Sequence, residues 1–208
     1  IYQELGAQLP GLTAAVLGLS NFVSRYIIII VVGLIAIVVL YRRWSKTPAG
    51  REIVDRTKLK LPVMGNLMQK ISLSRFTRTL STLIGGGVPM LESLKIASTT
   101  TDNVIIERQV LNARQMVSEG KSLNDSLKQA GQGQFPAMMI QMVNVGESTG
   151  TLDEMLGKLA NFFDDEVDNA VSSLLSALEP LVLIFVGGIV GTLVISMYLP
   201  LFNLIQQF

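Results

Sequence analysis

Residues 27–40 read IIIIVVGLIAIVVL and residues 181–199 read LVLIFVGGIVGTLVISMYL, and these two runs decide the class of the fold. Neither run contains a charged side chain. An α-helix needs about 20 apolar residues to cross a bilayer, and both runs are of that order. Two buried core helices of a soluble protein are the alternative, but core helices of such length usually keep one polar face. The runs therefore predict a membrane protein.

Flanking residues define the ends of the two predicted spans. Tyr26, Tyr41 and Trp44 border the first run, and aromatic residues favour the headgroup level of a bilayer. Because the first run is slightly short by itself, its helix is expected to include the residues before it. We therefore predict transmembrane helices at residues 22–44 and 177–199.

Basic residues close to the spans predict the orientation of the chain. Lys and Arg are enriched on the cytoplasmic side of membrane helices. No Lys or Arg follows the second span, whereas seven basic residues follow the first: Arg42, Arg43, Lys46, Arg51, Arg56, Lys58 and Lys60. The middle of the chain, residues 45–176, is therefore predicted to be cytoplasmic. Residues 1–21 and the tail at residues 200–208 are predicted to be extracytoplasmic.

The composition narrows the functions open to the chain. It has no His and no Cys, which excludes thiol nucleophiles, imidazole bases and most zinc, haem and iron–sulfur sites. Topology and anionic lipids explain the basic residues without nucleic acid. Four acidic residues could ligate a divalent cation, but on a helix they spread over different faces and are more simply a solvated surface. They are Asp164, Asp165, Glu166 and Asp168.

The pattern of apolar residues in the middle of the chain predicts about six helices, separated by Gly and Pro. Ser122 with Asp125 predicts an N-cap pair. The last helix is expected to run into the second span with a kink at Glu179-Pro180. Apolar residues three or four positions apart form the predicted core faces: Leu73, Phe76, Leu80 and Leu83; Leu91, Leu94 and Ala97; Ile106, Val110, Ala113 and Val117; and Leu152, Leu156, Leu159, Phe163, Val167, Val171, Leu174 and Leu178. The fold class is all-α, with a helical-bundle domain between two transmembrane helices.

Motifs that carry chemistry are missing. The glycine-rich segment Gly85–Pro89 lacks the Lys-Ser/Thr of a phosphate-binding loop. We therefore predict no enzyme activity, no catalytic residue and no cofactor. A subunit or fragment of a membrane transporter is the alternative function. The absence of ionisable residues from both spans weighs against it, since transport pathways commonly use them.

A set of short motifs resembles the type II secretion system F family, which supplies the inner-membrane platform protein of type II secretion and type IV pilus machines. The resemblance begins near residue 9 and runs to the C-terminus. The motifs are KTPAGR at 46–51, LPVMG at 61–65, RFTRTL at 75–80, GGVP at 86–89, VGESTGTLD at 145–153, LEPL at 178–181 and YLPLF at 198–202.

The resemblance implies a protein with two related six-helix cytoplasmic domains and three spans, of which this chain would hold the second domain and the last two spans. Residue 1 is Ile, and no signal-peptide pattern precedes the first run. We therefore expect the chain to be the later part of a longer polypeptide. The implied location is the bacterial inner membrane.

The function implied by the resemblance is assembly. A hexameric cytoplasmic ATPase would drive the platform, and pilin or pseudopilin subunits would pass from the bilayer into a growing fibre. Other expected partners are further inner-membrane assembly proteins, membrane lipids and other copies of the chain itself.

Two groups of residues are candidate interaction sites. A partner or oligomer surface is predicted at Gly87, Pro89, Glu147, Gly150 and Asp153. The structural alternative is that Gly87 and Pro89 shape a turn between helices and that Glu147 and Asp153 are pairing or capping groups. A small-residue face for helix packing in the second span is predicted at Gly187, Gly188 and Gly191.

Overall fold

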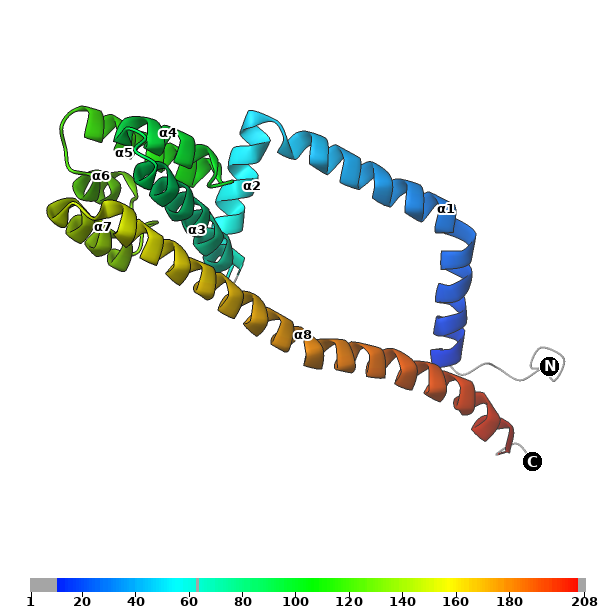
Figure 1. The fold of residues 1–208 in the computed structure, drawn as a ribbon. Coiled ribbons are helices and arrows are strands. Elements are labelled where there is room, and N and C mark those ends of the chain that lie inside the picture. The colour runs from blue at the N-terminus through cyan, green and yellow to red at the C-terminus, as the bar shows by residue number, and fades with distance from the viewer. Residues whose placement is uncertain (1–10, 63, 206–208) are drawn as a thin grey trace. The chain divides into compact units, whose positions relative to one another are not determined.

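The computed structural model describes residues 11–62 and 64–205, and over these residues the chain forms helices and no strand (Figure 1). The all-α class predicted from the sequence is confirmed. The helices are α1 (Gly11–Ser45), α2 (Pro48–Lys60), α3 (Met64–Gly85), α4 (Met90–Thr99), α5 (Val104–Ser118), α6 (Leu123–Ala130), α7 (Ala137–Thr149) and α8 (Leu152–Ile205).

The chain divides into two compact units. One unit, Trp44–Ser173, contains α2 to α7 and the first part of α8, and we call it the bundle. The other unit consists of Ile1–Arg43 and Leu174–Phe208, and it contains most of α1 and the last part of α8. Of the predicted extracytoplasmic segments, residues 1–10 and 206–208 lie outside the described residues.

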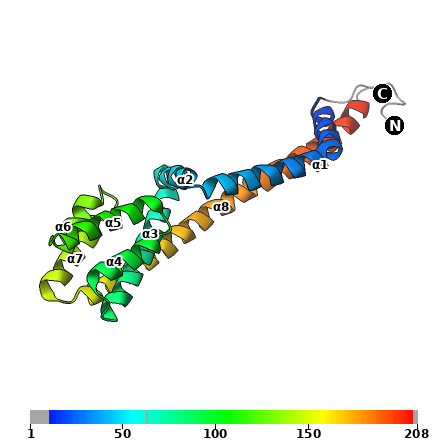
Figure 2. The same ribbon diagram turned by 90° about the horizontal axis from the view of Figure 1, so that it is seen from above.

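Consecutive helices of the bundle pack side by side, as Figure 2 shows for α3 to α7. The predicted core faces of α3, α4 and α5 are largely confirmed, although Leu83, Leu91 and Val117 are only partly buried. The core consists of Leu73, Phe76, Leu80, Leu94, Ala97, Ile106, Val110, Ala113, Leu123, Leu127, Ala130, Phe135, Met139, Val143, Leu152, Leu156, Leu159 and Phe163.

Glycine turns connect several pairs of helices in the bundle. Gly87, Gly120 and Gly150 have φ angles of 78°, 92° and 74°, which lie in the left-handed region that side chains disfavour. After α3, the N–H of Val88 donates to the carbonyl of Leu83 at 2.9 Å, the bond that closes a helix in a Schellman motif. The same bond pattern follows α5 and α7. The glycine in each of these turns therefore sets the direction of the helix that follows it.

The apolar stripe of α8 is only partly covered. Leu156, Leu159 and Phe163 are buried in the bundle, whereas Val171 and Leu178 are exposed. The predicted face therefore keeps its helical period along α8, but within the described chain its burial ends after Phe163.

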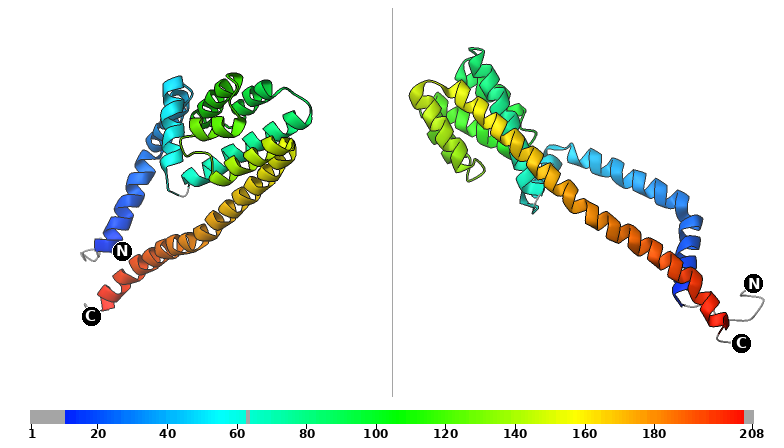
Figure 3. Two further views of the ribbon diagram at one scale, coloured as in Figure 1. Left: turned by 90° about the vertical axis from the view of Figure 1, so that its left-hand side faces the viewer. Right: turned by 60° about the horizontal axis from the view of Figure 1, so that its bottom comes forward.

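Within the part of the chain that the structure describes, two helices are long and apolar enough to cross a membrane by length and composition. These are α1 over Ala14–Ser45 and α8 over Leu152–Tyr198. Their apolar side chains are exposed, with Ile28 and Ile184 each at 75%. In Figure 3, α8 is one unbroken helix, and it continues through Pro180. The predicted kink at this proline stays a prediction.

We expect Phe76→Ala to destabilise the bundle by about 3–5 kcal/mol, because removal of a fully buried ring leaves a cavity. Thermal unfolding in detergent, followed by circular dichroism, measures the change. Phe162→Ala is the matched control, since Phe162 is 39% exposed. Equal losses of stability in the two variants would contradict the assigned core.

Candidate interaction surfaces

The side chain of Glu147 closes the N-terminus of α6. Its Oε1 accepts a hydrogen bond from the backbone N–H of Leu123 at 2.6 Å, and its Oε2 accepts one from Asn124 at 2.8 Å. The first N–H groups of a helix have no partner within the helix, and they favour negative charge. Glu147 lies on α7, so its half-buried carboxylate joins α7 to α6.

The next amides of α6 are satisfied locally. Ser122 Oγ accepts from the backbone N–H of Asp125 at 3.1 Å, which confirms the predicted N-cap. Ser126 N–H donates to the carbonyl of Ser122 at 3.0 Å. Together, Ser122 and Glu147 provide acceptors for the first four amides of α6.

Asp55 has a corresponding role at α5, which the sequence analysis missed. It lies on α2 and is 4% exposed, and its Oδ2 accepts from the backbone N–H of Val104 at 3.1 Å. The next two amides of α5 donate to Oδ1 of Asn103 at 2.9 and 3.3 Å. Lys58 lies 3.3 Å from Asp55 Oδ1 and partly offsets the buried charge. No sequence signal separates Asp55 from a solvated carboxylate in a basic segment.

The turn after α3 lies beside the start of α8. Ser81 Oγ, on α3, donates to the backbone carbonyl of Asp153 at 2.9 Å. A side chain built on Gly85 would come within 3.9 Å of the Asp153 side chain. The structure therefore places the end of α3, which leads into the Gly87–Pro89 turn, beside Asp153 in the first turn of α8.

Four of the five predicted surface residues are exposed, and one is not. Gly87, Pro89, Gly150 and Asp153 are exposed to solvent. Glu147 is instead directed at the N-terminus of α6. The carboxylate of Glu147 is thus engaged in holding the bundle together.

A row of polar contacts joins α3 to α8. Lys70 Nζ lies 2.6 Å from Glu166 Oε2. Asp164 accepts hydrogen bonds from Ser74 and Arg78, and Arg78 also donates to Asn161 Oδ1 at 2.8 Å. Two members of the acidic group considered for a cation site, Asp164 and Glu166, therefore bind α3 side chains.

The same contacts perturb Asp164. The hydrogen bond from Ser74 and then that from Arg78 hold the pKa of Asp164 below its usual range. Burial opposes this shift by disfavouring the charged form, but it is the smaller effect because the side chain is nearly half exposed.

The small-residue face of α8 is open in this chain. A Cβ atom added at Gly187, Gly188 or Gly191 would meet no other atom within 4 Å. These glycines leave the backbone of α8 accessible to another helix. Their role in helix packing stays a prediction.

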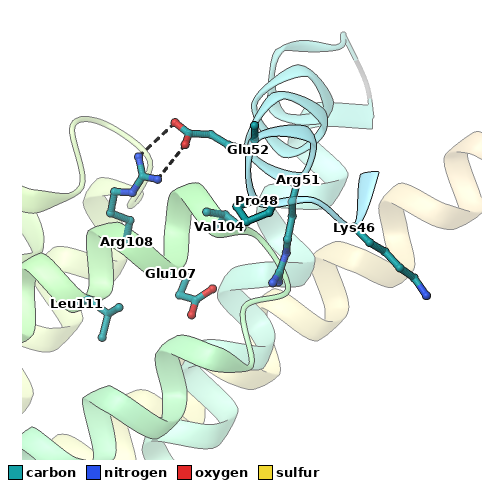
Figure 4. A pocket seen from close by; sticks show the side chains of 9 residues that line it. Lys46, Pro48, Arg51, Glu52, Val104, Glu107, Arg108 and Leu111 are labelled. Atoms are coloured by element: carbon teal, nitrogen blue, oxygen red, sulfur yellow. Dashed lines mark hydrogen bonds and ion pairs between the residues drawn. The ribbon is translucent and has the colours of Figure 1, made fainter. Parts of the chain in front are cut away.

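A groove of about 560 Å³ lies between α2 and α5 (Figure 4). Arg108 donates to both carboxylate oxygens of Glu52, at 3.2 and 3.0 Å, and these bonds close one side of the groove. The hydrogen bond from Arg108 lowers the pKa of Glu52. The groove is lined by Lys46, Pro48, Ala49, Arg51, Glu52, Val104, Glu107, Arg108 and Leu111.

The bundle and the two apolar helices define a helical scaffold whose polar side chains mainly tie helices to one another. The chain belongs to the family described as type II secretion system (T2SS), protein F, whose model matches residues 76–200. This assignment confirms the resemblance found in the sequence.

Similar proteins occur in both pilus assembly and secretion. The chain is 42% identical over 205 residues to type IV pilus assembly protein PilC of Thermus thermophilus, covering 99% of the chain and 50% of the relative. It is 38% identical over 204 residues to PilC of Myxococcus xanthus, covering 98% and 48%. It is 34% identical over 206 residues to type II secretion system protein F of Pseudomonas aeruginosa, covering 99% and 50%. The chain thus spans about half the length of these curated relatives.

Replacing Glu147 by Gln tests its role as a helix cap. We expect a loss of about 1–3 kcal/mol of stability, because two half-buried amides lose a charged acceptor. Thermal unfolding in detergent measures the loss. Glu154→Gln is the control, since Glu154 is exposed and pairs with Lys158 four residues away on the same helix. An unchanged melting temperature in Glu147→Gln would contradict the cap.

Asp164 predicts a dependence of stability on acid pH. A carboxyl group with a lowered pKa in the folded state stabilises the fold above its unfolded pKa of about 4, and this contribution is lost as the pH falls through the folded value. We expect Asp164→Asn to reduce the fall in melting temperature below about pH 4. The effect should be small, because Asp164 is nearly half exposed.

The control for the acid-pH experiment is Asp165→Asn, which removes an exposed neighbouring carboxylate. Melting curves recorded from neutral to acid pH should give the same profile for this variant and the original chain. If the two Asn variants have the same profile, the contacts of Asp164 with α3 do not stabilise the bundle.

Proposed function

We propose that the chain forms part of the inner-membrane platform of a type IV pilus or type II secretion machine. There it couples a cytoplasmic hexameric ATPase to the assembly of pilin or pseudopilin subunits, and it catalyses no reaction itself. Membership of the family carries the proposal, because the relatives are named for pilus assembly and for type II secretion.

The two apolar helices support a place in the membrane. They expose their apolar side chains in the described chain, and exposed apolar surface of this extent is stable in lipid and unfavourable in water. The basic residues that follow the first run support a cytoplasmic bundle, with both ends of the chain on the opposite side.

The contacts within the bundle support a mechanical role. Carboxylates of α2 and α7 hold the N-termini of α5 and α6, and polar side chains join α3 to α8. These links oppose sliding of one helix along another. Since α8 continues as one helix from Leu152 to Ile205, it offers a direct path along which a displacement of the bundle reaches the second apolar run.

The Gly87–Pro89 and Gly150–Asp153 turns form the surface proposed to meet the motor or another copy of the chain. Their exposed residues can be contacted without disturbing the core. Glu147 lies close by in sequence, but it contributes to the shape of this region through the α6 cap.

Photocrosslinking in cells tests the proposed surface. We expect a photoreactive amino acid at Asp153 or Pro89 to capture a hexameric secretion or pilus ATPase, or a second copy of the chain, because both positions are exposed on these turns. Mass spectrometry of the captured species identifies the partner.

Gln132 is the matched control for crosslinking, since it is exposed but lies in the turn between α6 and α7, at the opposite end of α7 from Gly150. Equal capture from Gln132 would contradict the assigned surface. Solute flux through the purified chain in liposomes, without capture of an ATPase, would support the transporter alternative instead.

A further inference from the structure

The groove between α2 and α5 carries cationic side chains that the bundle does not use. The bidentate contact of Arg108 with Glu52 satisfies both of these side chains. Arg51 remains inside the groove, where Glu107 opposes it, and Lys46 lines the edge of the groove with its side chain directed away from Arg51 (Figure 4). Among the described residues, the Arg51 side chain makes only a long contact of 4.0 Å with Asp55, which already accepts hydrogen bonds from Val104 and Lys58. A net positive charge is therefore exposed in a concave surface.

The junction that leads into α2 fixes the backbone that carries these cations. Both the N–H and the hydroxyl of Thr47 donate to the carbonyl of Trp44, at 3.0 and 2.6 Å. Gly50 N–H donates to Thr47 Oγ1 at 3.2 Å, and a side chain at Gly50 would collide with the Trp44 carbonyl. The path from Trp44 to Arg51 is thus fixed by backbone contacts, and binding there costs little ordering of the main chain.

Chain connectivity brings the groove within reach of lipid headgroups if α1 crosses the membrane. Helix α1 continues to Ser45, which is four residues beyond Tyr41 at the end of the apolar run. At a rise of 1.5 Å per residue, Ser45 lies about 6 Å beyond Tyr41 along the helix. The headgroup region on each side of a bilayer has a similar thickness, so Lys46 follows at its level.

We propose that the groove binds the headgroup of an anionic phospholipid, with Arg51 inside the groove as the ligand of the phosphate and Lys46 at the edge as a second cation that attracts it. Arg and Lys are the side chains best suited to phosphate oxygens. The apolar atoms of Pro48, Val104 and Leu111 offer a surface for the lipid's carbon atoms. Glu107 can accept a headgroup hydroxyl, which makes phosphatidylglycerol the appropriate probe.

This proposal rests on the proposed membrane insertion of α1, and one experiment tests the two separately. Trp44 is the single tryptophan of the chain and lies two residues before Lys46. Its fluorescence is measured with the chain reconstituted into mixed vesicles of phosphatidylcholine and phosphatidylglycerol, with bromine atoms on the acyl chains of one lipid at a time. Because bromine quenches tryptophan at short range, the two series give the relative affinity of the lipids for this site.

We expect brominated phosphatidylglycerol to quench Trp44 more strongly than its share of the vesicle lipid predicts. The double variant Lys46→Gln, Arg51→Gln should lose this preference. Each basic residue close to an anionic surface contributes about fivefold in affinity. Circular dichroism of the double variant checks that the bundle is folded, and quenching by brominated phosphatidylcholine checks that Trp44 is still in the membrane.

The matched control replaces Arg42 and Arg43 by Gln, two basic residues nearer the apolar run that do not line the groove. If this control loses the preference for phosphatidylglycerol to the same extent, binding in the groove is wrong, and a non-specific basic strip explains the preference. Equal quenching of the original chain by the two lipids would also overturn it. If neither brominated lipid quenches Trp44, the end of α1 is not in the membrane. That result would contradict the proposed function as well as the lipid site.

Discussion

The bundle depends on carboxylates that satisfy the N-termini of other helices. Helix α6 has only 8 residues, and a helix of this length is not stable alone in water. It persists because Glu147 and Ser122 accept its first amides while Leu123 and Leu127 fill the core. The same arrangement joins α2 to α5 through Asp55. Each of these ties satisfies backbone groups and joins two helices, consecutive ones in the case of Glu147 and more distant ones in the case of Asp55.

Local and periodic features of the fold could be predicted from the sequence, because the side chains that cause them are neighbours along the chain. The core faces of α3 and α5 follow from apolar spacing, and the Ser122 cap follows from a pattern of four residues. The start of α2 also had a local signal, since Thr47 before Pro48 is a typical N-cap with proline at the first helical position.

Contacts between distant segments could not be predicted in this way. Asp55 and Val104 are 49 positions apart, and nothing near Asp55 indicates that its partner is a backbone amide. The start of α8 shows a related limit of local patterns. Thr151 and Glu154 match the sequence pattern of a capping box. In the structure, however, the backbone N–H of Thr151 donates to the carbonyl of Gly146, and Glu154 pairs with Lys158. Tertiary contacts decide which of several possible partners a polar group takes.

The segment VGESTG at residues 145–150 shows how a motif can identify a family without specifying a partner. Gly146 lacks room for a side chain, because an added Cβ would lie 2.9 Å from the Cα of Leu152. Glu147 caps α6, and Gly150 takes a left-handed conformation. Packing, capping and turn geometry therefore account for all three residues without any partner. Asp153 closes the same family motif, but its side chain is exposed, so the fold leaves it available for an interaction outside the bundle.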